Sequence, residues 1–166
     1  MEDEYIRFGK IVNTHGIKGE LRILSDFKYK DRVFVQNRRI YIGEDKEEHV
    51  ITSYRHHKIF DMIKLAGYDD INEVLRFKNK DVYVRKNDLN LGKKEFLDED
   101  LINLNVVFND KEVGYVVAIR QINPKNKIIE AKINDKMIMI PYHDNFIKDV
   151  DLDNKKIVLD LIEGMI

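Results

Sequence analysis

The chain has 166 residues, enough for one compact domain or two small ones, and it contains no cysteine and no tryptophan. The lack of cysteine excludes disulfides, thiol chemistry, iron–sulfur clusters and zinc sites built from cysteine. With 29 Lys and Arg against 30 Asp and Glu, the net charge of −1 argues against non-specific binding of nucleic acid by the whole surface.

The first half of the sequence has the pattern of short β-strands separated by polar turns. Apolar residues are spaced by even numbers between Ile6 and Val12, as a half-buried strand requires. Further strands are predicted at 21–23, 33–35, 40–42, 50–54, 59–65 and 82–84. A helix of about two turns is predicted after Asp70, because Asp70 can cap it and Ile71, Val74 and Leu75 share one face.

A polar segment without periodicity, 87–95, is predicted to be a linker between a first domain, 1–86, and a second domain, 96–166. Strand patterns restart after it, and the predicted strands are 101–108, 113–122, 128–133, 137–140, 147–150 and 157–161. The predicted fold class is therefore all-β, with two small β-barrels, a short linker, and one short helix at the end of the first domain.

Basic residues are concentrated near the start of the chain. Residues 7–39 contain nine Lys or Arg and three Asp or Glu. Residues 89–166 are acidic, with 11 Lys and Arg against 14 Asp and Glu. Two explanations of the basic segment are equally good. It is either a solvated barrel exterior or a phosphate-facing patch, whose Lys and Arg residues would release counterions from nucleic acid.

The most distinctive stretch is a loop between the first two predicted strands, which reads His-Gly-Ile-Lys-Gly-Glu. Gly16 and Gly19 permit a positive φ or a close backbone approach. We therefore expect a hairpin with His15 and Lys18 at its tip and Arg22 on the polar face of the outgoing strand. Such a loop can contact a phosphate backbone or the surface of a partner. No helix follows it, so it is not a nucleotide-binding P-loop.

This stretch resembles the opening signature of the RimM family of bacterial ribosome maturation factors, a Gly-Lys/Arg-Ile-Val strand followed by His-Gly-Ile/Leu-Lys/Arg-Gly-Glu. Further blocks agree in order and spacing, and these are 67–70, 80–84, 100–106, 138–141, 146–151, 157–161 and 163–165. The resemblance implies a six-stranded barrel similar to a translation-factor barrel, followed by a PRC barrel, with no catalysis and no cofactor.

The resemblance also implies a function. The protein would be an accessory factor for maturation of the small (30S) ribosomal subunit, assisting head assembly and late 16S rRNA processing by binding ribosomal protein S-nineteen and nearby rRNA. Our hypothesis, from the charge of the two domains, is that the basic first barrel contacts rRNA or the ribosome through His15, Lys18 and Arg22. The more acidic second barrel would contact the ribosomal protein through Phe96, Leu97 and Asp100. Phe96-Leu97 replaces a Tyr-Tyr pair that is usual in the family. The alternative is a PRC-type protein-interaction adaptor unrelated to the ribosome.

The sequence gives only weak support for a metal site or a catalytic site. His56 and His57 are adjacent on a predicted strand, so they point to opposite faces and cannot easily share a metal ion. His143-Asp144 lacks an accompanying nucleophile motif. No apolar run approaches the roughly 18 residues of a membrane helix, and the N-terminus is acidic. We expect a cytoplasmic monomer that is not an enzyme, with no cofactor, no metal and no membrane partner.

Overall fold

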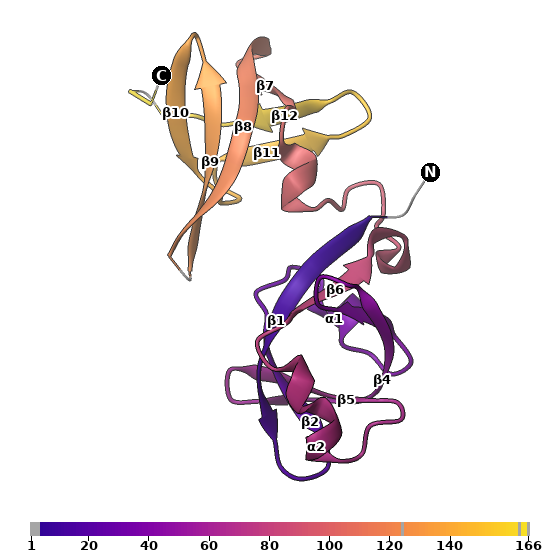
Figure 1. Cartoon of the computed structure of the whole chain (residues 1–166). Helices are drawn as coiled ribbons and strands as arrows, with labels where there is room; N and C mark the ends of the chain where they lie inside the picture. Colours follow the sequence, from indigo (N-terminus) through magenta and orange to yellow (C-terminus); the bar gives the residue numbers. More distant parts are fainter. Residues whose placement is uncertain (1–3, 124, 163, 166) are drawn as a thin grey trace. The chain divides into compact units, whose positions relative to one another are not determined.

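The computed structural model describes residues 4–123, 125–162 and 164–165 of the chain. Two compact units, Met1–Asn90 and Leu91–Ile166, are each built around six strands (Figure 1). The boundary falls inside the segment 87–95 that the sequence predicts to be a linker. Pro124 of a predicted turn and Glu163 of the closing block lie outside the described residues.

The first unit is a closed antiparallel barrel. Its strands are β1 (Tyr5–His15), β2 (Glu20–Leu24), β3 (Arg39–Ile42), β4 (Glu47–His57), β5 (Phe60–Leu65) and β6 (Asp81–Arg85). They pair in the order β1-β2-β5-β4-β3-β6, and pairing of β1 with β6 closes the ring. Ile11, Leu21, Ile23 and Ile63 are fully buried and fill the interior. Closure leaves no strand edge exposed to pair with other chains.

The predicted strand at 33–35 is wrong, because Val33 ends a one-turn helix, α1 (Lys30–Val33). Val33 and Phe34 are both buried. The ring of Phe34 packs edge-on against Phe8, with centroids 5.4 Å apart, and stacks on Tyr54 at 5.3 Å. Three consecutive apolar residues carry no alternation, so a helical turn that buries two of them satisfies the same pattern.

The predicted helix after Asp70 is confirmed as α2 (Ile71–Val74), which continues as the 3-10 helix η1 (Leu75–Phe77). The Asp70 carboxylate accepts a hydrogen bond of 2.9 Å from the backbone N–H of Asn72. Val74 and Phe77 are completely buried. A second 3-10 helix, η2 (Lys86–Leu89), ends the first unit and occupies part of the predicted linker, with its Leu89 side chain buried.

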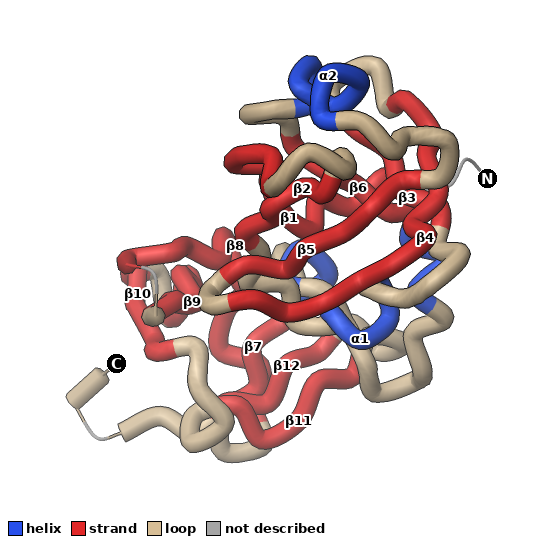
Figure 2. The backbone as a smooth tube through the Cα atoms, turned by 90° about the horizontal axis from the view of Figure 1, so that it is seen from below, coloured by secondary structure: helices blue, strands red, loops and turns tan. Residues whose placement is uncertain are grey.

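The second unit is a six-stranded sheet preceded by the 3-10 helix η3 (Asp98–Leu101). Its strands are β7 (Asn105–Phe108), β8 (Lys111–Asn123), β9 (Asn126–Ile133), β10 (Lys136–Pro141), β11 (Ile147–Asp151) and β12 (Lys156–Leu159). They are ordered β10-β9-β8-β7-β12-β11 (Figure 2). Strands β7 and β12 are parallel, and the other neighbours are antiparallel. Leu101, Val106, Val116 and Ile129 lie in its core.

The strand predicted at 101–108 begins too early, because residues 98–101 form η3 and the strand starts at Asn105. The Asp100 carboxylate accepts a hydrogen bond of 2.9 Å from the N–H of Leu97 and so closes the helical turn. Leu101 and Leu104 are both buried although they are three residues apart, a spacing that suits a turn better than a strand. No helix in the described ranges has the length and apolar character needed to cross a membrane.

Gly114 marks a close approach of β8 to β9. A Cβ atom at this position would lie 1.8 Å from the carbonyl oxygen of Lys132, so the strands would have to separate. We expect Gly114→Ala to lower the free energy of unfolding by about 2–3 kcal/mol, measured by urea unfolding. Gly92→Ala is the control, because its Cβ would meet the flexible side chain of Glu95. Equal losses in both variants would contradict the strand-separation argument.

Candidate functional site

The loop between β1 and β2 has the geometry that its glycines predict. Gly16 and Gly19 have φ values of +70° and +86°, in the left-handed region. A Cβ atom on Gly19 would lie 3.1 Å from the carbonyl oxygen of Tyr68. The carbonyl oxygen of Ile17 accepts a hydrogen bond of 3.0 Å from the N–H of Ile71. The loop therefore rests on the segment that leads into α2.

A charged and aromatic cluster fixes that segment against β4. The guanidinium of Arg76 donates to both carboxylate oxygens of Glu47, at 2.8 and 2.7 Å, and to the hydroxyl of Tyr68 at 3.1 Å. His49 Nε2 lies 2.9 Å from the same carboxylate, and the His49 ring packs edge-on against Tyr68 and Phe77. The hydrogen bonds from Arg76 lower the pKa of Glu47 to about 2. These contacts tie the base of the loop to the barrel wall.

Outside the barrel, the strand register aligns Arg22 of β2, Met62 of β5 and Arg55 of β4 in one row. Arg55 forms a bidentate ion pair with Glu20, with N–O distances of 2.7 and 2.8 Å. This pairing lowers the pKa of the Glu20 carboxyl. The guanidinium of Arg22 lies 5.5 Å from the centre of the Phe60 ring. The row thus presents two guanidinium groups beside one carboxylate.

Two histidines meet on the same face. The rings of His15 and His57 lie 5.8 Å apart, and Nη2 of Arg22 lies 2.6 Å from Nδ1 of His15. Because a guanidinium can only donate, Nδ1 accepts and His15 carries its proton on Nε2. Desolvation, together with the nearby charges of Arg55, Lys58 and Arg22, lowers the pKa of His57. The nearby cations therefore already oppose a further positive charge on His57.

We call His15, Arg22, Arg55 and His57 the cationic face. Among the described residues, Nε of Arg22 finds no hydrogen-bond partner, although it is buried. Hydrogen-bond donors and positive charge therefore exceed what Glu20 can satisfy. An anion placed on this face would gain charge-assisted hydrogen bonds.

The structure brings together His15 and Arg22 of the three predicted rRNA-contact residues. Lys18 lies at the exposed loop tip beside Ile17, whose side chain is 78% exposed. Sequence reasoning missed Arg55 and His57, because pairing of β2 with β5 brings them in from a distant hairpin. The sequence indicates His57 only as one of two adjacent histidines, without any link to Arg22. His56 points instead towards Asp61, as expected for adjacent strand residues.

A buried carboxylate in the barrel, Asp61, is a structural group. It is 1% exposed and accepts hydrogen bonds from Lys30 at 2.9 Å and from Tyr54 at 2.7 Å, with His56 at 3.2 Å. Burial alone would raise its pKa, but these donors lower it. In the described part of the chain, no cluster of three or more His, Asp or Glu residues could hold a metal ion.

The second predicted set lies at the entry to the second unit. Leu97 is 5% exposed, and Phe96 is half-buried against the core of that unit. The Asp100 carboxylate is engaged by the N–H of Leu97. Lys127 of β9 pairs with Asp98 at 2.6 Å and anchors η3 to the sheet. The segment is thus held firmly, with Phe96 and Asp100 partly accessible.

The fold and this site define a class of protein, an all-β chain in which a closed barrel bearing a glycine hairpin precedes a second six-stranded unit. The family described as RimM N-terminal domain matches residues 6–89. The family described as RimM PRC barrel domain matches residues 98–165. The chain belongs to the RimM family.

Similar proteins span the full length of the chain. Ribosome maturation factor RimM from an Exiguobacterium species is 32% identical, covering 98% of this chain and 97% of the relative. Ribosome maturation factor RimM from Oceanobacillus iheyensis is 34% identical, covering 95% of both chains. A crystal structure described as a 16S ribosomal RNA processing protein RimM, from Pseudomonas aeruginosa, is 22% identical over 96% of this chain and 98% of that chain, with a TM-score of 0.47.

Burial of His49 predicts a pH-dependent stability. Desolvation lowers the pKa of His49 below 6.5 in the folded state, so the unfolded chain binds the extra proton first. The stabilisation is therefore present above pH 6.5 and is lost progressively as the pH falls below that value. Urea unfolding between pH 7 and pH 5 should show this loss, and His49→Gln should flatten the dependence.

The exposed His143 provides the control for this experiment. His143→Gln should leave the pH dependence of the free energy of unfolding unchanged. An unchanged dependence in His49→Gln would show that another group causes the loss of stability.

Proposed function

We propose that this protein is a non-enzymatic accessory factor for maturation of the small (30S) ribosomal subunit. It would assist assembly of the head and late 16S rRNA processing by binding ribosomal protein S-nineteen and nearby rRNA, acting as a cytoplasmic monomer. The observation that carries this proposal is the match of both units to RimM domains. Full-length relatives named ribosome maturation factor support the same assignment.

The cationic face is suited to rRNA phosphates. Arg22 and Arg55 supply permanent charge, and Nε2–H of His15 supplies a directed donor. Lys18 at the loop tip extends the positive surface. Phosphate contacts of this kind position a protein on RNA without reading its sequence, so the face would fix orientation more than it selects a base.

The second unit is suited to a basic ribosomal protein. Residues 89–166 carry 11 Lys and Arg against 14 Asp and Glu, so the unit is acidic. We assign the contact to Phe96, with Asp100 beside it and the buried Leu97 holding the segment in place. A half-buried aromatic anchor can supply much of the binding energy. Opposite charge would speed the encounter more than it adds affinity.

Assembly help of this kind needs only differential binding. A factor that binds a partly folded head better than competing states shifts the population towards that state. It leaves when the mature surface removes its contacts. This mechanism makes and breaks no covalent bond, so it needs neither a nucleophile nor a cofactor.

Co-sedimentation with small subunits tests the proposal. The protein should travel with free small subunits, especially immature ones. Lys18→Glu should weaken this binding and reduce the slope of log affinity against log salt by about one, because one phosphate contact is lost. Lys78→Glu makes the same charge change at an exposed position outside the cationic face and should have little effect. A wild-type protein that never travels with small subunits refutes the proposal.

Phe96→Ala should weaken binding to purified ribosomal protein S-nineteen while leaving the salt slope for small-subunit binding unchanged. Phe108→Ala is the matched control, because Phe108 is also half-buried against the core of the second unit. Both variants lose similar packing, so a loss of affinity in Phe96→Ala alone identifies a contact. Isothermal titration calorimetry measures both affinities. Equal losses in the two variants would remove Phe96 from the interface.

A further inference from the structure

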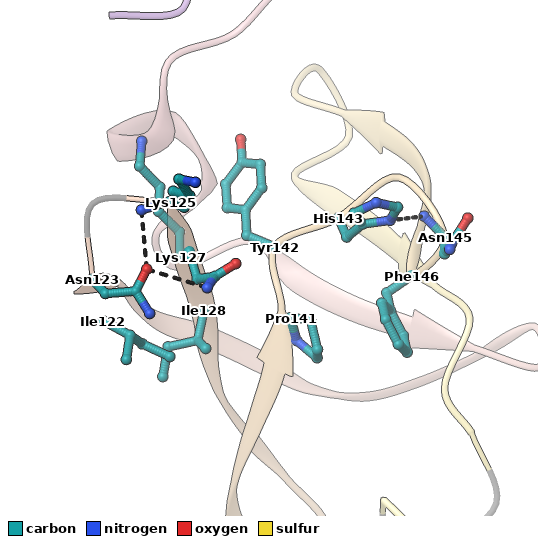
Figure 3. A pocket seen from close by; sticks show the side chains of 11 residues that line it. Ile122, Asn123, Lys125, Lys127, Ile128, Pro141, Tyr142, His143, Asn145 and Phe146 are labelled. Carbon is teal, nitrogen blue, oxygen red and sulfur yellow. Dashed lines mark hydrogen bonds between the residues drawn. The ribbon is translucent and has the colours of Figure 1, made fainter. Parts of the chain in front are cut away.

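The second unit contains a pocket beside the hairpin of β8 and β9 (Figure 3). Its volume is about 540 Å³, within the range of ligand-binding pockets. Its walls come from both arms of the hairpin and from residues 141–146, which follow β10. The side chains that matter here are Ile122, Lys125, Lys127, Tyr142, His143 and Phe146.

The pocket is cationic although the unit is acidic. Lys125, Lys127 and His143 line it, and none of the described residues that line it is Asp or Glu. Lys127 is paired with Asp98, whereas Lys125 makes no ion pair among the described residues. The positive charge of the pocket therefore repels the basic protein segments that the acidic remainder of the unit attracts. It favours binding of an anion.

Hydrogen bonds within the pocket fix the direction of one donor and the shape of the hairpin. Nδ1 of His143 accepts a hydrogen bond of 3.1 Å from the N–H of Asn145, so the ring proton of a neutral His143 lies on Nε2. The carboxamide oxygen of Asn123 accepts from the N–H of Lys125 at 3.0 Å and from the side chain of Asn126 at 3.2 Å. These two bonds shape the hairpin from which the Lys125 ammonium extends (Figure 3).

The remaining walls are apolar or aromatic. Ile122 is 60% exposed, and Tyr142 and Phe146 add two rings. Figure 3 places the Tyr142 ring between the lysine side chains of the hairpin and His143. An inorganic anion would use the charge but leave this apolar surface in contact with water. A ligand that carries both an anionic group and a flat ring satisfies both parts.

We propose that this pocket binds one nucleotide of single-stranded RNA, with its phosphate near Lys125 and its base against Tyr142 and Ile122. Unstacked bases of single strands pack on aromatic side chains, whereas the bases of a duplex are not available. The inference rests on the proposed function for the source of the RNA. It gives the second unit an RNA contact in addition to its ribosomal-protein contact.

The test uses the full chain and three probes, namely adenosine 5′-monophosphate, inorganic phosphate and a single-stranded RNA of six nucleotides. In NMR titrations, the nucleotide and the RNA should shift the Tyr142 ring and His143 resonances at concentrations where phosphate does not. Inorganic phosphate binding as tightly as the nucleotide would overturn the base contact. A lack of any shift at Tyr142 and His143 would overturn the pocket.

Charge-reversal variants separate the pocket from general electrostatics. Lys125→Glu should weaken binding of the RNA at least about tenfold, because a charge-assisted contact is lost and a repulsive one is gained. Lys136→Glu makes the same change at an exposed position outside the pocket and should weaken binding less than about twofold. Similar losses in both variants would overturn the proposal. If a hexaglutamate peptide binds more tightly than the RNA, the proposal is wrong and the ligand of the pocket is an acidic protein segment.

The two proposals fail separately. If the protein travels with small subunits but shows no nucleotide-dependent shifts, the nucleotide-binding pocket is refuted and the proposed function stands. If it binds the nucleotide but never travels with small subunits, the proposed function is refuted and the nucleotide-binding pocket stands.

Discussion

The contact between the β1–β2 loop and the segment before α2 constrains the whole candidate site of the first unit. A Cβ atom on Gly19 would make an unusually tight contact with the carbonyl oxygen of Tyr68, and the φ of Gly19 is positive. Both facts favour glycine at this position. The Glu47–Arg76 ion pair and His49 then hold that segment on β4. The loop is thereby oriented by the barrel wall and does not depend on its own few residues for its shape.

That orientation has an electrostatic consequence. The loop begins after His15, the last residue of β1, which meets Arg22 on the next strand and His57 from the β4–β5 hairpin. Glu20 is the carboxylate that faces this group, and Arg55 engages both of its oxygens. The residual positive charge is held in place by backbone geometry, which lowers the entropy cost of binding an anion. Desolvation, and after it the same crowding of cations, lowers the pKa of His57.

Local patterns in the sequence predicted most strands, the capped helix and the glycine loop, because alternation, capping and turn chemistry act over a few residues. They failed at Val33 and at the start of β7, where short apolar runs fit either a turn or a strand. They also failed to place Arg55 and His57 beside Arg22. That contact depends on the pairing of β2 with β5 and of β5 with β4, which no local pattern specifies.

The second unit shows why net charge alone is a poor guide to what a domain binds. Its excess of carboxylates favours a basic protein partner, but its pocket is lined by lysines and a histidine. Lys127 is held by Asp98 while Lys125 extends from the hairpin, so one cation stabilises η3 and the other faces solvent. Screening confines each of these fields to about 8–10 Å. Surfaces of opposite sign can therefore act independently within one small domain, and each selects its ligand by local geometry.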